Sequence, residues 1–180
     1  MNYYTILLIV LMCISCKEPQ ARKPVTVKSG TFLQNSIERT KKRLEKENNY
    51  ILSYIKNDST NTYINSKKGF WYVYIKQDTL ATYTPQFGDK ITYTYSVTDL
   101  NDNIIYNTEE IGKKTYYIDQ QDDIIEGFRQ GLKLIKQNEE IKYIFPSQLA
   151  YGYRGDGQKI NINAPIMCSV KLHNITTKND

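Results

Sequence analysis

Few side chains of this protein are of the types that usually carry enzyme chemistry, and none of them is arranged for it. The chain has one histidine, His173, and three cysteines. A nucleophilic system needs a histidine beside a serine or cysteine, and a zinc site needs paired ligands at short spacing. Neither pattern occurs. The adjacent carboxylates Asp122 and Asp123 suit the positive end of a helix dipole, which leaves a hydrolytic acid–base pair little support. We therefore expect no metal ion and no cofactor, and any catalysis must do without a strong acid, base or nucleophile.

Glycine spacing and charge disfavour two further classes of binding site. Gly152, Gly155 and Gly157 follow a predicted strand, but the Gly-Lys-Ser/Thr of a phosphate-binding loop does not come after them. The net charge is +5, and residues 17–47 supply it with nine basic and four acidic side chains. A nucleic-acid-binding domain usually needs a cationic surface that displaces phosphate counterions. Because the rest of the chain is balanced, we expect no nucleic acid partner.

The amino terminus has the composition of a targeting signal. Residues 4–15 are uncharged and almost wholly apolar, and twelve helical residues cover about 18 Å, too little for a hydrocarbon layer of about 30 Å. A small residue followed by Cys16 resembles a bacterial lipobox, which implies that residues 1–15 are a lipoprotein signal peptide and that Cys16 is acylated. The alternative is an ordinary signal peptide whose cysteine is incidental. Lipidation would hold the protein on a membrane of the cell envelope, and Lys17 favours the outer membrane, facing the periplasm.

A tether and a long helix are predicted next. Residues 16–30 are polar and contain two prolines, which is typical of a flexible spacer. An amphipathic helix over about residues 31–56, with a linker to residue 68, is indicated by one apolar stripe at helical spacing. The stripe consists of Leu33, Ile37, Leu44, Ile51 and Ile55. The helix could pack on its own domain, form a homodimer or lie near anionic lipid, and the sequence does not separate these alternatives.

From residue 69 the pattern changes to strands with one short helix. Asp123 and Glu126 fit a capping box, and Ile125, Phe128, Leu132 and Ile135 form a buried stripe behind it. Asn101–Asn103 is predicted as a turn, and Cys168 as a small core residue. The fold class is therefore α+β, an antiparallel sheet with a helix against it. Aromatic and β-branched residues predict strands at 70–75, 91–97, 114–118, 140–145 and 166–172.

The segment 87–178 resembles an FKBP-type peptidyl-prolyl isomerase domain. Four segments carry the resemblance in family order: FGDKITYTY, DDIIEGFRQGL, FPSQLAYGYRGDG and KININAPIMCSVKL. The resemblance implies an FKBP-like sheet wrapped around one short helix, preceded by the N-terminal helix and by an extra strand region at 69–86. The tether, the helix and the GFWYVY strand also resemble the gliding-motility-associated FKBP-type lipoproteins.

The resemblance also implies a site. Phe128 would form the floor under the substrate proline, and the Ile125 N–H and the Tyr151 hydroxyl would hold peptide carbonyls. Three positions depart from the family: Phe128 replaces the commonest Trp, Asn107 replaces an Asp, and Cys168 replaces an aromatic. The catalytic set that the family implies is Tyr95, Tyr106, Asn107, Phe128 and Tyr151, and the substrate-binding set is Tyr117, Ile124, Ile125 and Ile160.

Three functions follow as hypotheses. The first is a membrane-anchored prolyl isomerase that acts on proline-containing unfolded or exported envelope proteins, including those of the gliding-motility machinery. The second is an FKBP-fold chaperone or binding module with little or no turnover, because Asn107 lacks the carboxylate that relatives have. The third is a purely structural lipoprotein.

Overall fold

The computed structural model describes residues 29–121 and 123–178. The chain divides into two units, residues 1–39 and 40–180. The description begins with helix α2 (Ser29–Asn57), which runs from the first unit into the second and confirms the helix expected at 31–56. Leu33 and Ile37 are exposed there. The predicted signal peptide, Cys16 and most of the tether lie outside the described residues.

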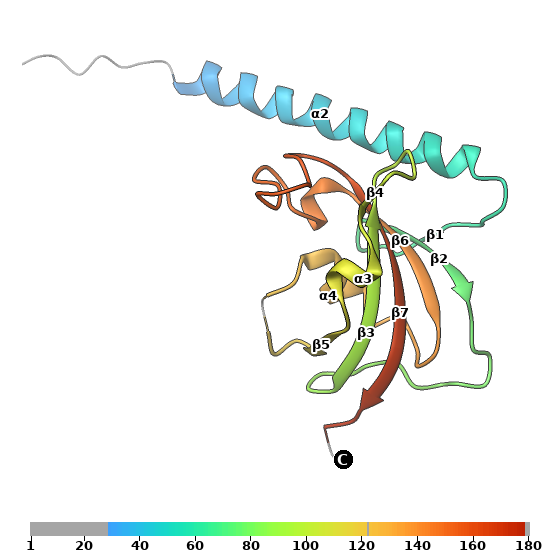
Figure 1. Ribbon diagram of the computed structural model, residues 1–180. Helices are drawn as coiled ribbons and strands as arrows, with labels where there is room; N and C mark the ends of the chain where they lie inside the picture. The colour runs from blue at the N-terminus through green and yellow to red at the C-terminus, as the bar shows by residue number, and fades with distance from the viewer. Residues whose placement is uncertain (1–28, 122, 179–180) are drawn as a thin grey trace, which may run out of the picture. The chain divides into compact units, whose positions relative to one another are not determined.

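The second unit is built on a seven-stranded antiparallel sheet, shown in Figure 1. The strands follow the order β1-β2-β6-β7-β3-β4, and β5 pairs with β3. With the helices, this confirms the α+β class. The strands are β1 (Ile64–Asn65), β2 (Trp71–Lys76), β3 (Lys90–Thr98), β4 (Ile104–Tyr106), β5 (Lys114–Tyr117), β6 (Glu140–Phe145) and β7 (Ile166–Thr176).

Strand β7 lies between two long neighbours and fixes their register. It pairs with β3 from Lys90↔Thr176 to Thr98↔Met167, and with β6 from Glu140↔Lys171 to Phe145↔Ile166. Because side chains alternate between the faces of a sheet, a one-residue slip would reverse every buried side chain of these strands. The predicted Asn101–Asn103 turn is confirmed between β3 and β4, where the Asp99 N–H donates to the Asn103 carbonyl at 3.0 Å.

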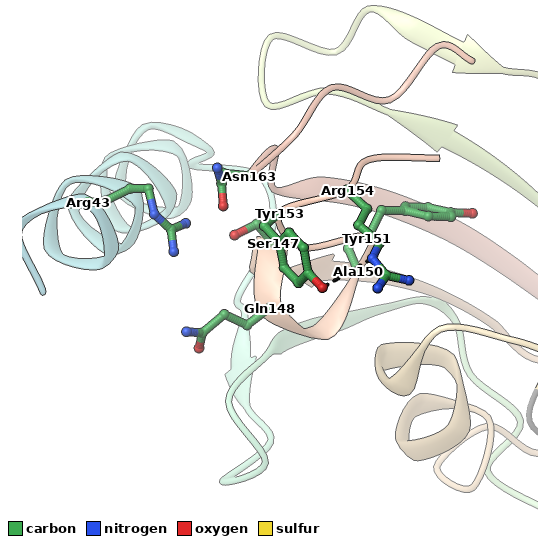
Figure 2. Close-up of a pocket in the computed structure, with 9 residues that line it drawn as sticks. Arg43, Ser147, Gln148, Ala150, Tyr151, Tyr153, Arg154 and Asn163 are labelled. Carbon is green, nitrogen blue, oxygen red and sulfur yellow. Dashed lines mark hydrogen bonds between the residues drawn. The ribbon is translucent and has the colours of Figure 1, made fainter. Parts of the chain in front are cut away.

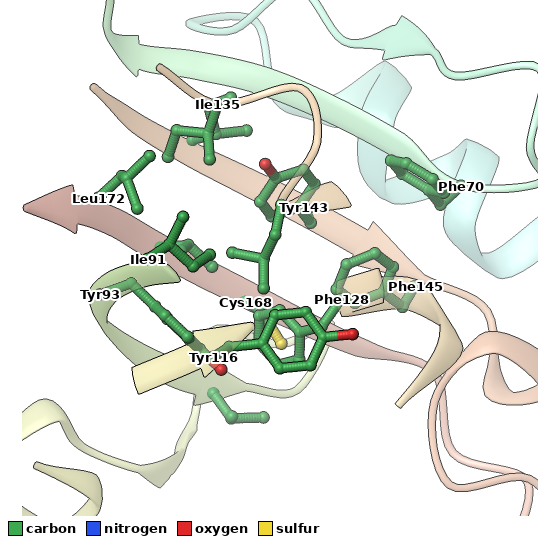
Figure 3. Packing of buried hydrophobic residues seen from close by; sticks show 14 of the residues in the cluster. Phe70, Ile91, Tyr93, Tyr116, Phe128, Ile135, Tyr143, Phe145, Cys168 and Leu172 are labelled. Atoms are coloured by element: carbon green, nitrogen blue, oxygen red, sulfur yellow. The ribbon is translucent and has the colours of Figure 1, made fainter. Parts of the chain in front are cut away.

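The sheet is buried on both faces. On β6, Tyr143 and Phe145 enter a large core together with Phe128, whereas Ile144 enters a smaller core with Ile51 of helix α2. The large core is rich in aromatic rings, as Figure 3 shows. Cys168 lies fully buried in it, as expected of a small core residue, and burial raises the pKa of its thiol.

The short helix begins later than its sequence indicates. Helix α4 (Glu126–Gly131) has Ile125 as its N-cap, with no side-chain hydrogen bond to the cap. The predicted capping box of Asp123 and Glu126 is therefore wrong. The reason is that α4 begins at Glu126, so Asp123 lies two residues ahead of the N-cap Ile125, whose carbonyl accepts the N–H groups of Phe128 and Arg129. Four short elements were not predicted, the strands β1 and β4, helix α3 (Thr108–Ile111) and the 3₁₀ helix η1 (Ser147–Leu149).

Helix α4 approaches strand β6 closely because of Gly127. A Cβ at this position would lie 2.5 Å from Cδ1 of Phe145, well inside van der Waals contact. Phe145 is fully buried and packs against Phe128 with ring centroids 5.6 Å apart. It has no space to move away, so the absence of a side chain at Gly127 sets the distance between helix and sheet.

No helix within residues 29–121 and 123–178 combines the length and the apolar character needed to cross a membrane.

We predict that Gly127→Ala destabilises the domain by about 1–3 kcal/mol, the usual cost of overpacking a core. Urea unfolding followed by circular dichroism measures the change. Gly30→Ala is the control, since nothing lies within 4 Å of a Cβ there. An unfolding free energy for Gly127→Ala equal to that of the wild type would contradict the close approach described here.

Candidate functional site

A cavity of about 440 Å³ lies at one end of the sheet, walled by several tyrosines. Strand β3 contributes Tyr95 and Val97 to it, and the other elements contribute side chains that are far apart in the sequence. Three of the residues predicted for the site meet here, namely Tyr95, Tyr106 and Tyr151. The remaining lining residues are Glu110, Ile111, Lys114, Asp156 and Gln158.

Tyr95 packs against the aromatic core. Its ring contacts that of Phe128 edge to face, with centroids 4.8 Å apart, and stacks on Tyr93 at 5.8 Å. Aromatic pairs of this geometry restrict both rings. Burial raises the pKa of Tyr95, so its hydroxyl stays protonated at neutral pH. Among the residues described, no group hydrogen-bonds to this hydroxyl, and it is available to a molecule in the cavity.

Tyr151 follows the 3₁₀ helix η1 and is held by its backbone neighbours. The N–H groups of Ala150 and Gly152 both donate to the Ser147 carbonyl, at 3.1 and 2.8 Å. Burial raises the pKa of Tyr151 strongly. In the part of the chain that the structure covers, its hydroxyl also has no hydrogen-bond partner. The hydroxyls of Tyr95 and Tyr151 are therefore two hydrogen-bond donors available in the cavity.

Asp156 brings a carboxylate to the cavity that the sequence did not lead us to expect. The Tyr106 hydroxyl donates to its Oδ2 at 2.5 Å, and the N–H groups of Gln158 and Ile160 donate to its Oδ1 at 2.8 Å each. Burial alone would raise the pKa of Asp156, but these hydrogen bonds outweigh it and the pKa is lowered. The loop can fold back this tightly because Gly155 has φ of 66° and a Cβ there would lie 2.5 Å from the Ile160 carbonyl oxygen.

Asn107 has a different place from the one that family resemblance implied. Its side-chain oxygen accepts the Glu110 N–H at 2.7 Å and so caps helix α3. The side chain is exposed and does not line the cavity. Asn107 therefore brings no carboxylate to the cavity, while Asp156 supplies one from another loop.

The other predicted residues lie around the cavity without lining it. Phe128 and Ile160 are each only 4% exposed, and Phe128 acts through its contact with Tyr95. Ile124 and Ile125 are half-buried at the start of α4, and no described group accepts the Ile125 N–H. Tyr117 is exposed on β5.

Within the described ranges, no three histidine, cysteine, aspartate or glutamate side chains gather closely enough to hold a metal ion. The cavity offers hydrogen-bond donors, aromatic surface and the carboxylates of Asp156 and Glu110, the latter paired with Lys159 at 2.6 Å.

The family model for the FKBP-type peptidyl-prolyl cis-trans isomerase matches residues 81–173, which is more than half of the chain. The chain belongs to this family. The match covers the cavity and every element that lines it. It begins six residues before the expected domain start at residue 87 and includes all the site residues that the resemblance implied.

Two curated relatives carry the family name. A "Probable FKBP-type peptidyl-prolyl cis-trans isomerase" of Haemophilus influenzae is 26% identical over 91 residues, 51% of this chain and 36% of the relative. A "Probable FKBP-type peptidyl-prolyl cis-trans isomerase FkpA" of Neisseria meningitidis is 32% identical over 90 residues, 49% of this chain and 32% of the relative. The match thus spans about a third of the length of either relative.

Solved structures share the FKBP fold at low sequence identity. A peptidyl-prolyl cis-trans isomerase of Pseudomonas syringae has a TM-score of 0.61 at 16% identity, over 77% of this chain and 96% of that one. FkpA of Escherichia coli has a TM-score of 0.60 at 20% identity, over 99% of this chain and 84% of that one. These likenesses concern the fold alone.

The stability that the Asp156 carboxylate contributes to the FKBP domain should depend on pH. Because the folded-state pKa is lowered, the stability it contributes is present above the ordinary value of 3.8 and is lost as the pH falls through the folded-state pKa. We predict that Asp156→Asn is less stable than the wild type at pH 7, and that the difference narrows as the pH falls below 3.8.

Urea unfolding of both proteins between pH 7 and pH 3 measures this difference. Tyr106→Phe removes one donor to the carboxylate, so the pH at which stability is lost should rise in that variant. A difference between wild type and Asp156→Asn that stays constant down to pH 3 would show that the carboxylate is not held as described.

Proposed function

We propose that this FKBP-family chain is a peptidyl-prolyl cis-trans isomerase and that the tyrosine-lined cavity is its active site. The observation that carries the proposal is the meeting of Tyr95, Tyr106 and Tyr151 around one cavity, within the segment that matches the family. Two of their hydroxyls are free to bond to a peptide, and Tyr106 is fixed by Asp156.

The reaction suits a site of this composition. Rotation about an X-Pro bond faces a barrier of about 18–20 kcal/mol because resonance keeps the amide planar. Water stabilises the planar, polarised amide through its oxygen. A cavity that excludes this water and holds the flanking carbonyls favours the twisted transition state. A reduction of the barrier by about 4 kcal/mol corresponds to roughly a thousandfold acceleration.

Each group in the cavity has a role in this scheme. Tyr151, with its raised pKa, remains a donor and holds a carbonyl of the substrate. Tyr95, supported by Phe128, provides an apolar wall with a polar edge. Asp156 keeps Tyr106 in one orientation. No proton needs to be transferred, which agrees with a site made of un-ionised phenols.

A binding or chaperone module with little turnover is the second candidate. The placement of Asn107 favours it, since the side chain caps α3 and contributes no charge to the cavity. The two candidates differ in one measurement, a proline-isomerisation assay on the full chain with and without an FKBP-pocket macrolide. Catalysis that the ligand abolishes supports the isomerase, and ligand binding without catalysis supports the binding module.

We propose that the cavity acts in the bacterial cell envelope, on exported proteins that contain proline. The support is the lipobox-like Cys16 after an apolar segment, and the resemblance of the N-terminal region to gliding-motility-associated lipoproteins. Acylated Cys16 would anchor the protein to the outer membrane, and the polar residues after it would let the domain reach its clients.

We predict that Tyr151→Phe lowers kcat/KM about tenfold, the equivalent of one lost hydrogen bond of about 1.4 kcal/mol. The control is Tyr153→Phe, because Tyr153 is 71% exposed and its hydroxyl pairs with Arg154 outside the cavity. A protease-coupled assay on a proline peptide measures both. If Tyr151→Phe is as active as the wild type, the Tyr151 hydroxyl takes no part in the reaction and the cavity is not the active site proposed here. Phe128→Ala is a poorer test, since this core ring would cost about 3–5 kcal/mol of stability.

We predict that Cys16→Ser abolishes both fatty-acid labelling and membrane retention of the full chain. The thioether and amide acylation of a lipoprotein require this cysteine. Metabolic labelling with a palmitate analogue, followed by membrane fractionation, measures both effects, and Cys13→Ser is the matched control. Labelling that survives in Cys16→Ser would contradict the anchor and leave the isomerase proposal untouched.

A further inference from the structure

Helix α2 is joined to the loop that carries Tyr151 by one buried carboxylate. Glu47 is 9% exposed, and its Oε1 accepts the Ser147 N–H at 2.5 Å. Its Oε2 accepts the Ser147 hydroxyl at 2.7 Å. Both oxygens thus bind the same residue, which lies a hundred positions away in the sequence. Hydrogen bonds to an ionised acceptor are stronger than those between neutral groups, so Ser147 is held from two directions.

Ser147 in turn holds the backbone on either side of Tyr151. Its carbonyl accepts the N–H groups of Ala150 and Gly152. Every hydrogen-bonding group of Ser147 is therefore used, its two donors toward Glu47 and its acceptor toward the loop. Figure 2 shows Ser147 beside the helix, while the ring of Tyr151 points away from it. The chain of contacts runs from helix α2 through Ser147 to the Tyr151 backbone.

The surroundings of Glu47 keep it in place. Arg43 Nη1 lies 3.7 Å from Glu47 Oε2, which partly compensates a carboxylate withdrawn from water. Arg43 also lines a cleft of about 740 Å³ with Gln148 and Tyr153, and Tyr151 borders both this cleft and the tyrosine-lined cavity. An unpaired buried carboxylate would be costly, and the bonds to Ser147 together with Arg43 avoid that cost.

Glu47 is not needed merely to attach the helix. Ile51 is fully buried one turn further on, in the core formed with Ile144 and Met167. Hydrogen bonds of Tyr50 to Asn101 and of Tyr54 to Asp102 hold the same part of α2. Because these contacts remain without the Glu47 charge, the effect of that charge on the loop can be separated from docking of the helix.

We propose that Glu47 is a positioning residue for the isomerase reaction: by fixing Ser147 it fixes the Tyr151 hydroxyl in the cavity. The inference rests on the proposed function and extends it, since it gives helix α2 a part in the active site that lies outside the family-matched segment.

The experiment compares Glu47→Gln and Ser147→Ala in the full chain, with Glu45→Gln as control. Glu45 is exposed on the same helix. A glutamine offers only one acceptor to the two donors of Ser147, so we expect kcat/KM to fall about tenfold, as for small displacements of a catalytic group. The control should keep wild-type activity. Ser147→Ala retains the backbone bond to Glu47, so we expect a smaller loss of kcat/KM. This variant tests the proposal if Glu47→Gln does not fold.

The decisive readout is a double-mutant cycle with Tyr151→Phe. If Glu47 acts through the Tyr151 hydroxyl, Glu47→Gln costs nothing further in the Tyr151→Phe background. If the kcat/KM losses of the two single variants multiply in the double variant, Glu47 acts independently of the Tyr151 hydroxyl, and the proposal is overturned.

A second readout does not need turnover. With ¹³C-labelled tyrosine, the ring resonances of Tyr151, identified by their absence in Tyr151→Phe, should shift in Glu47→Gln and stay in place in Glu45→Gln. Unchanged resonances in Glu47→Gln would overturn the inference. A wild type without isomerase activity would overturn the proposed function, while the resonances would still decide whether Glu47 positions Tyr151.

Discussion

The structure depends on strands β6 and β7 being buried on both faces. Alternate side chains of these strands enter two separate cores, one beneath helix α4 and the other beneath helix α2. The pairing of β7 with both β3 and β6 fixes which residue enters which core. Since β3 carries Tyr95 and the loop after β6 carries Tyr151, this one register also brings the walls of the cavity together.

The cavity has a carboxylate that comes from a distant part of the chain. The family resemblance implied an aspartate directly after Tyr106, whereas this chain has Asn107 there and uses it as a helix cap. Asp156 reaches Tyr106 from a loop fifty positions further on. The Tyr106 hydroxyl therefore has a carboxylate partner although Asn107 provides none. This bears on the doubt about turnover that Asn107 raised from the sequence.

The sequence was a good guide where local patterns decide the structure. Alternating aromatic and β-branched residues located the long strands, and the apolar stripe ending at Ile55 located helix α2. The capping box at Asp123 failed because α4 has Ile125 as its N-cap, an apolar residue that does not mark a helix start in the sequence. Asp156 and Glu47 were missed for a different reason. Each looks like an ordinary turn or surface residue, and its partner becomes a neighbour only through the fold.

The position of the single tryptophan gives the smaller core an optical signature of its own. Trp71 lies on β2, opposite Ile144, and packs against the core that contains Ile51 of helix α2. The active-site cavity is lined by tyrosines and not by Trp71. Indole emission therefore reports on the packing of α2 against the sheet. Excitation at the red edge of indole absorption selects Trp71 over the sixteen tyrosines, so the packing of α2 can be followed without a signal from the rings that line the cavity.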